Sequence, residues 1–137
     1  MKTLPLGVTL IDLLITIAIV SITAGLSLPS LTQTLAETRA EMYMKSLSRV
    51  IIYTRIYAIT QGHAVTICPL KGSECSTDWS ENISVFVDRN MDREKASDER
   101  LLKLVDDPAK NDFLTYPRRG ITFRSDGSIN GYQSGTF

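Results

Sequence analysis

One acidic residue, Asp12, lies near the start of an apolar run that covers residues 8–28 and contains no other charge. A lone carboxylate inside hydrocarbon costs about 2.5–3.5 kcal/mol on insertion scales, so an acid at this position indicates a specific function. As a helix, the run spans about 30 Å, the thickness of the hydrocarbon core of a bilayer. Lys2 is the only basic residue before it, which predicts a cytoplasmic N-terminus and a chain that continues outside. The sequence therefore predicts one membrane span whose acid needs a partner.

Two other interpretations of this segment stay open. A secretory signal peptide would be cleaved after the apolar run, where Ala24, Gly25 and Ser27 provide small residues. Alternatively, the Asp12 side chain reaches the lipid headgroups at the end of a retained span and has no further role. We favour a retained span with a functional acid, because of the aspartate itself and the helical pattern that follows the run.

The only two cysteines, Cys68 and Cys75, lie close together in the segment TICPLKGSEC. An even count at short spacing, in a region predicted to lie outside the cytoplasm, favours one disulfide. Such a bond would stabilise the fold by about 2 kcal/mol in a chain-entropy account. The alternative is a zinc site that recruits His63, the only histidine, but it lacks a fourth ligand.

An acidic segment matches part of a calcium-binding template. Four oxygen-bearing residues fall at positions one, three, five and twelve of that template: Asp88, Asn90, Asp92 and Glu99. Arg93 stands where the template needs glycine, and predicted strands replace the flanking helices. An ordinary solvated loop with Asx turns is therefore the favoured interpretation. Calcium is the one cofactor that the sequence suggests, and otherwise we expect none.

Basic residues gather toward the C-terminus. The candidates for contact with DNA are Lys110, Arg118, Arg119 and Arg124. Tyr116 and Tyr132 would add stacking to single-stranded bases. The formal net charge of the chain is zero, so this is a weak electrostatic footprint, and a solvated face is the alternative.

Few residues suit catalysis. There is one histidine, the cysteines are expected to be paired, and no nucleophile motif accompanies them. We therefore expect that the protein is not an enzyme.

The elements that position these residues follow from the hydrophobic pattern of the 137-residue chain. A helical pattern runs to Gln61 and stops at Gly62. One apolar stripe follows it: Tyr43, Leu47, Val50, Ile51, Thr54 and Ala58. Beyond Gly62 the period becomes two, which predicts strands at 63–69, 83–88, 100–105 and 121–124, with a hairpin turn at Asp126-Gly127. The predicted fold class is α+β: a long N-terminal helix, transmembrane and then amphipathic, packed on a small, mostly antiparallel sheet.

The start of the chain resembles the type IV pilin superfamily. The resemblance rests on a short basic leader that ends in Gly7, the apolar run, the acid Asp12 and the proline Pro29. It implies that a prepilin peptidase cleaves after Gly7 and methylates the new N-terminal residue, Val8. It also implies that Asp12 neutralises the N-terminal amine of a neighbouring subunit in a filament, and that Pro29 kinks the helix. The usual residues of the family are phenylalanine at the first mature position and glutamate at the fifth, where this chain has Val8 and Asp12.

The second half resembles the FimT/GspH group of minor pilins and pseudopilins. The features that carry the resemblance are a strand entering a Cys-Pro, a short loop to a second cysteine, Trp79, a strand ending in Phe-Val-Asp, and a Glu-Arg-Leu-Leu strand. Relatives usually continue past the last hairpin into further strands and an arginine-bearing tail, whereas this sequence stops at SGTF. The resemblance implies four segments: a leader (1–7), a transmembrane and filament-core helix (8–28), its amphipathic continuation (29–62) and a β-rich periplasmic head (63–137).

This resemblance implies a subunit that is anchored in the bacterial inner membrane by a single span, with its head in the periplasm, before it is assembled into a filament. Its expected partners are the prepilin peptidase, the membrane, other pilins along the N-terminal helix and DNA, with no small-molecule substrate. The favoured function is a minor pilin of a type IV pilus, whose head helps to initiate assembly and contacts DNA for uptake. The alternatives are a GspH-like pseudopilin of the type II secretion system and a membrane-anchored periplasmic domain that never assembles.

Overall fold

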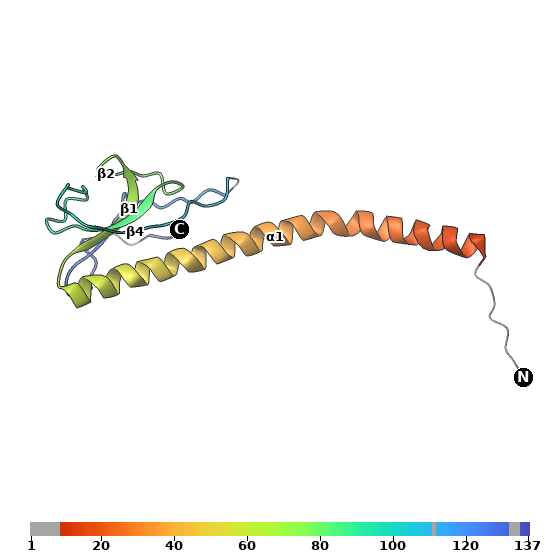
Figure 1. Ribbon diagram of the computed structural model, residues 1–137, viewed down its shortest axis with the longest axis horizontal. Helices are drawn as coiled ribbons and strands as arrows, with labels where there is room; N and C mark the ends of the chain where they lie inside the picture. Colours follow the sequence, from red (N-terminus) through yellow and green to blue (C-terminus); the bar gives the residue numbers. More distant parts are fainter. Residues whose placement is uncertain (1–8, 111, 132–134) are drawn as a thin grey trace, which may run out of the picture. The chain divides into compact units, whose positions relative to one another are not determined.

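The computed structural model describes residues 9–110, 112–131 and 135–137, and for residues 26–30 only the backbone. The chain forms two compact units, Met1–Arg39 and Ala40–Phe137. Within the described residues, one helix is followed by five short strands (Figure 1). The sequence-based prediction of an α+β protein with a small antiparallel sheet is confirmed.

Helix α1 runs from Leu10 to Gln61. It ends at the predicted residue, because Gly62 adopts a left-handed conformation (φ 68°) and its N–H donates to the carbonyl of Ala58 at 3.0 Å. The helical backbone continues through Pro29. In the part of the chain that the structure describes, no helix is both long and apolar enough to cross a membrane.

The sheet belongs to the second unit. Its strands are β1 (Val65–Lys71), β2 (Glu74–Cys75), β3 (Ile83–Val87), β4 (Leu101–Leu104) and β5 (Ile121–Phe123). All pairs are antiparallel, the order is β2-β1-β3-β4, and β5 also pairs with β1. Four strands lie where the pattern predicted them, within two residues, whereas the two-residue strand β2 is too short to leave a periodic signal.

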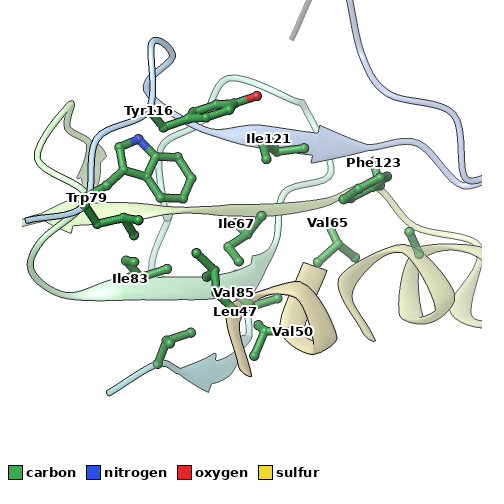
Figure 2. Packing of buried hydrophobic residues seen from close by; sticks show 13 residues of the cluster. Leu47, Val50, Val65, Ile67, Trp79, Ile83, Val85, Tyr116, Ile121 and Phe123 are labelled. Carbon is green, nitrogen blue, oxygen red and sulfur yellow. The ribbon is translucent and has the colours of Figure 1, made fainter. Parts of the chain in front are cut away.

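The predicted helical stripe packs on this sheet. Leu47, Val50 and Ala58 are buried in one cluster with side chains of β1, β3 and β5, as Figure 2 shows for Leu47 and Val50. Thr54 is also fully buried, and its hydroxyl donates to the carbonyl of Val50 at 2.7 Å, which satisfies it within the helix. Tyr43 and Ile51 are partly buried at the margin of the cluster.

The far face of the sheet is covered as well. The alternating pattern predicts one buried face, yet every residue of β3 and the first five of β1 are buried. Phe86 packs there with the cystine of Cys68 and Cys75, and Leu70 lies against them. Central strands that are covered on both sides bury polar residues too, so alternation underestimates their burial.

An aromatic cluster joins the C-terminal residues to the core. The Trp79 ring is fully buried, and its indole N–H donates to the carbonyl of Arg118 at 2.7 Å. Edge-to-face contacts join it to Tyr116 and Phe137, with ring centroids 5.1 and 5.2 Å away, and those two rings stack at 4.4 Å. Phe137 is therefore partly buried and packs against the core.

Candidate assembly and binding sites

Asp12, the one charged residue of the apolar run, forms a capping box with Thr9 at the start of α1. One carboxylate oxygen, Oδ2, accepts the backbone N–H of Thr9 at 3.0 Å and its hydroxyl at 2.7 Å. In return, the backbone N–H of Asp12 donates to the Thr9 hydroxyl oxygen at 3.4 Å. Three residues separate the pair, as in the S/T-x-x-E pattern, with aspartate in place of glutamate. The carboxylate is thus held against the first turn of its own helix.

The helix after this cap exposes apolar side chains on all of its sides. Nine large ones between residues 10 and 22 are more than half exposed: Leu10, Ile11, Leu13, Leu14, Ile15, Ile17, Ile19, Val20 and Ile22. A helix that is hydrophobic all round is normally buried by its surroundings. This segment therefore offers a surface for an apolar environment. The predicted processing residues Gly7 and Val8 lie outside the described residues, and of Pro29 only the helical backbone is described.

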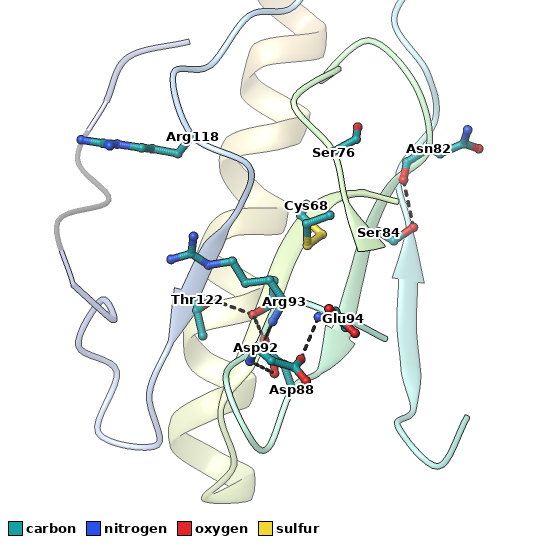
Figure 3. Close-up of a disulfide and its surroundings, with 12 residues drawn as sticks. Cys68, Ser76, Asn82, Ser84, Asp88, Asp92, Arg93, Glu94, Arg118 and Thr122 are labelled. Carbon is teal, nitrogen blue, oxygen red and sulfur yellow. Dashed lines mark hydrogen bonds between the residues drawn. A yellow bond between two sulfur atoms is a disulfide. The ribbon is translucent and has the colours of Figure 1, made fainter. Parts of the chain in front are cut away.

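The predicted disulfide is present between Cys68 and Cys75 (Figure 3). It connects β1 to β2, both sulfur-bearing residues are buried, and their Cα atoms are 5.6 Å apart. Because both thiols are consumed, they cannot ligate zinc with His63.

The acidic segment uses its carboxylates to hold its own backbone. Asp88 is fully buried, and its two oxygens accept the N–H groups of Asp92 and Arg93, each at 3.2 Å (Figure 3). Glu99 is also buried and accepts the N–H groups of Arg89 at 2.9 Å and Ala96 at 3.1 Å. These bonds satisfy carboxylates that would be costly to bury alone.

The other two members of the calcium template pair with each other. The Asn90 amide donates to one Asp92 oxygen at 2.6 Å, and the other oxygen accepts the N–H of Glu94 at 2.8 Å. Among the described residues, no group of three or more His, Cys, Asp or Glu side chains is placed to hold a metal ion. The bond from the N–H of Glu94 to Asp92 is an Asx turn of the kind that the sequence favoured. The expectation of a solvated loop is wrong for Asp88 and Glu99, because both are buried and bond to the backbone of the segment.

The predicted DNA-binding residues do not form one patch. Arg119 lines a cavity of about 260 Å³ together with Lys71, beside the disulfide. Arg124 lies five positions further along the chain, beyond β5, and an extended strand of that length spans about 16 Å. Arg124 lines a different cavity, of about 310 Å³. Arg118 is exposed and its carbonyl is bound by Trp79. Lys110 is an exposed residue of the loop before β5 and lines neither of these two cavities.

Two further residues lie beside Arg124, and nothing in the sequence indicated that they would lie together. Arg89 and His63 line the same cavity as Arg124. They are far apart in the sequence, and only the register of the sheet brings them together: Val65 pairs with Val87 on one side and with Phe123 on the other. The residues that follow β3 and β5 therefore meet the residues that precede β1.

The chain matches the sequence model of a known protein family. The sequence model of a family described as type II transport protein GspH matches residues 44–137, which is more than half of the chain and includes every strand of the sheet. No curated protein and no solved structure matches.

Proposed function

Because that match covers more than half of its length, the chain belongs to the GspH family of pseudopilin-like proteins, and we propose that it is a subunit of the type II secretion pseudopilus. The match of the head to a type II transport family is the observation that carries this choice over the type IV pilus. The disulfide between Cys68 and Cys75 supports a head on the periplasmic side, since such bonds persist in oxidising compartments.

In this proposal, the exposed apolar residues of α1 pack first in the inner membrane and then against the helices of neighbouring subunits. A prepilin peptidase cleaves after Gly7 and frees an α-amine on Val8. That amine is positive and Asp12 is negative, so pairing them between subunits removes two charges that are costly in an apolar filament core. The capping box supports this role because it holds the carboxylate at the start of the helix.

Processing is tested first, by mass spectrometry of the full chain expressed with a prepilin peptidase. Gly7→Leu should retain the leader and its mass. Gly25→Ala is the matched control, because nothing lies within 4 Å of a Cβ placed there, and it should be processed normally. A wild-type chain that keeps its leader beside an active peptidase would refute the proposal.

Assembly and the choice of machine are tested in the native host. Asp12→Ala should be processed normally but fail to enter filaments, and deletion of the gene should abolish secretion of type II cargo. Normal incorporation of Asp12→Ala would contradict the charge pairing. Loss of surface pili with normal secretion would instead assign the protein to a type IV pilus.

A further inference from the structure

Three basic side chains line one cavity of the head. The cavity has a volume of about 310 Å³, and His63, Arg89, Arg124 and Ser125 line it together with Gly62 and Met91. No acidic side chain lines it within the described part of the chain. We call it the basic cavity.

A buried polar chain fixes the strands that carry its two arginines. The Thr66 hydroxyl lies 2.6 Å from a carboxylate oxygen of Asp88 and 2.7 Å from the hydroxyl of Thr122. All three residues are 0% exposed. Thr66 is the second residue of β1, Asp88 directly follows β3, and Thr122 is the middle residue of β5. The polar chain therefore crosses the sheet near the strand ends that carry the basic cavity. Buried polar groups are costly unless bonded, and a fully bonded network specifies one arrangement.

Each arginine also has its own support. The Nε and Nη2 groups of Arg124 donate to the amide oxygen of Asn130 at 3.2 and 2.7 Å, which leaves Nη1 outside this pair of bonds. The backbone of Arg89 is held by the buried carboxylate of Glu99. Asp126 interacts electrostatically with Arg124, and its carboxylate accepts hydrogen bonds from the hydroxyl and the N–H of Ser128.

We propose that the basic cavity binds a phosphate group. Guanidinium groups bind phosphate through paired, charge-assisted hydrogen bonds, and the hydroxyl of Ser125 adds a neutral donor. Pockets for small ligands begin at about 300 Å³, so the cavity accommodates a phosphate together with part of the group that it esterifies. Lipid headgroups, nucleic-acid backbones and free phosphate share this chemistry. The site is independent of the assembly role proposed for α1.

The test uses the full chain in nonionic detergent, titrated with three probes at constant ionic strength: inorganic phosphate, glycerol phosphate and oligothymidylate. Binding is measured by calorimetry. At least one probe should bind, and Arg89→Gln and Arg124→Gln should each weaken it by about tenfold or more. Arg119→Gln, at the far end of β5, is the matched control and should leave it unchanged. The probe whose binding is weakened by both Arg89→Gln and Arg124→Gln identifies the source of the phosphate.

Thr66 tests the polar chain as a positioning device. Thr66→Val keeps the shape of the side chain but breaks both bonds, and should weaken binding at a temperature where the variant is folded. Thr66→Ser keeps the hydroxyl and should restore it. Binding of none of the probes, or binding that Arg119→Gln reduces as much as Arg89→Gln and Arg124→Gln do, would overturn the proposal.

Discussion

Asp12 and Thr9 bond to each other in both directions at the start of α1, with the Asp12 carboxylate 2.7 Å from the Thr9 hydroxyl and 3.0 Å from its backbone nitrogen. The carboxylate therefore has partners within its own chain before any neighbour arrives. In an apolar environment, the bonds from Thr9 keep the carboxylate hydrogen-bonded even when no cation pairs with it. In the charge pairing proposed above, the amine of a neighbouring subunit must compete with, or add to, the bonds from Thr9.

The first prediction concerns this cap. Thr9→Ala removes the hydroxyl that accepts the N–H of Asp12, so the first turn of α1 should fray and the helix should lose about 1 kcal/mol. Thr9→Ser keeps the hydroxyl and should behave as the wild type. Hydrogen exchange of the amides of residues 12 and 13, measured on the full chain, should accelerate only in the alanine variant. Equal protection in both variants would mean that the capping box does not hold the helix start.

A second prediction concerns the disulfide. The double substitution of Cys68 and Cys75 by alanine should lower the free energy of unfolding by about 2 kcal/mol, because it frees a short loop in the unfolded chain. Urea unfolding of the wild type with and without a reducing agent gives the same comparison. The reducing agent should not alter the unfolding of the double variant. If the oxidised and reduced wild-type proteins unfold at the same urea concentration, the bond contributes no stability.

Several parts of the fold could be predicted because their signals are local. Gly62 ends α1 in the left-handed conformation that glycine favours, and Asp126-Gly127 forms the predicted hairpin turn, with the N–H of Gly127 donating to the carbonyl of Arg124 at 2.8 Å. The stripe on α1 faces the core because helical periodicity depends only on neighbours in the sequence. Cys68 and Cys75 are the only two cysteines, so a disulfide within the chain has a single possible pairing.

The basic cavity could not be predicted, because it depends on strand register. Val65 meets Val87 and Phe123 from opposite sides, and nothing local in the sequence encodes either pairing. The same register buries Asp88, which the sequence presents as one more acid of a charged loop. Arg119 and Arg124 are close in the sequence but lie beyond opposite ends of β5, because an extended strand separates them.

A third prediction concerns Tyr43. Its hydroxyl is a buried side-chain polar atom without a hydrogen-bond partner in the described structure, and burial, together with the nearby Asp107 and Asp106, raises the pKa of the phenol. Tyr43→Phe removes an unsatisfied group and keeps the ring, so it should raise the free energy of unfolding by about 1 kcal/mol. Tyr116→Phe, which removes a hydroxyl from another ring of the same core, is the control. A Tyr43→Phe variant that unfolds more easily than the wild type would reveal a hydroxyl partner.

A fourth prediction separates backbone strain from crowding at two glycines. Gly127 and Gly131 both have positive φ, 78° and 77°, so alanine at either position should cost about 1–2 kcal/mol in strain. A Cβ on Gly127 would also lie 2.6 Å from the Cδ1 of Ile59, whereas nothing lies within 4 Å of one on Gly131. Thermal unfolding should therefore show a larger loss for Gly127→Ala than for Gly131→Ala. Equal losses would show that Ile59 moves aside without cost.

The last prediction concerns pH and the hairpin turn. The hydroxyl and N–H of Ser128 bind the carboxylate of Asp126 at 2.6 and 2.8 Å, and these bonds lower the pKa of Asp126 below its ordinary value. A carboxyl whose pKa is lower in the folded state contributes stability above its unfolded pKa, and that contribution is lost as the pH falls through the folded pKa.

Ser128→Ala should therefore melt at a lower temperature than the wild type at neutral pH, and the difference should shrink as the solution is acidified below the ordinary carboxyl range. Asp126→Asn should abolish this pH dependence, because asparagine accepts the same bonds without titrating. Melting curves at a series of pH values, at constant ionic strength, provide the measurement. A difference between Ser128→Ala and the wild type that stays constant down to strong acid would show that the bonds from Ser128 do not depend on the charge of Asp126.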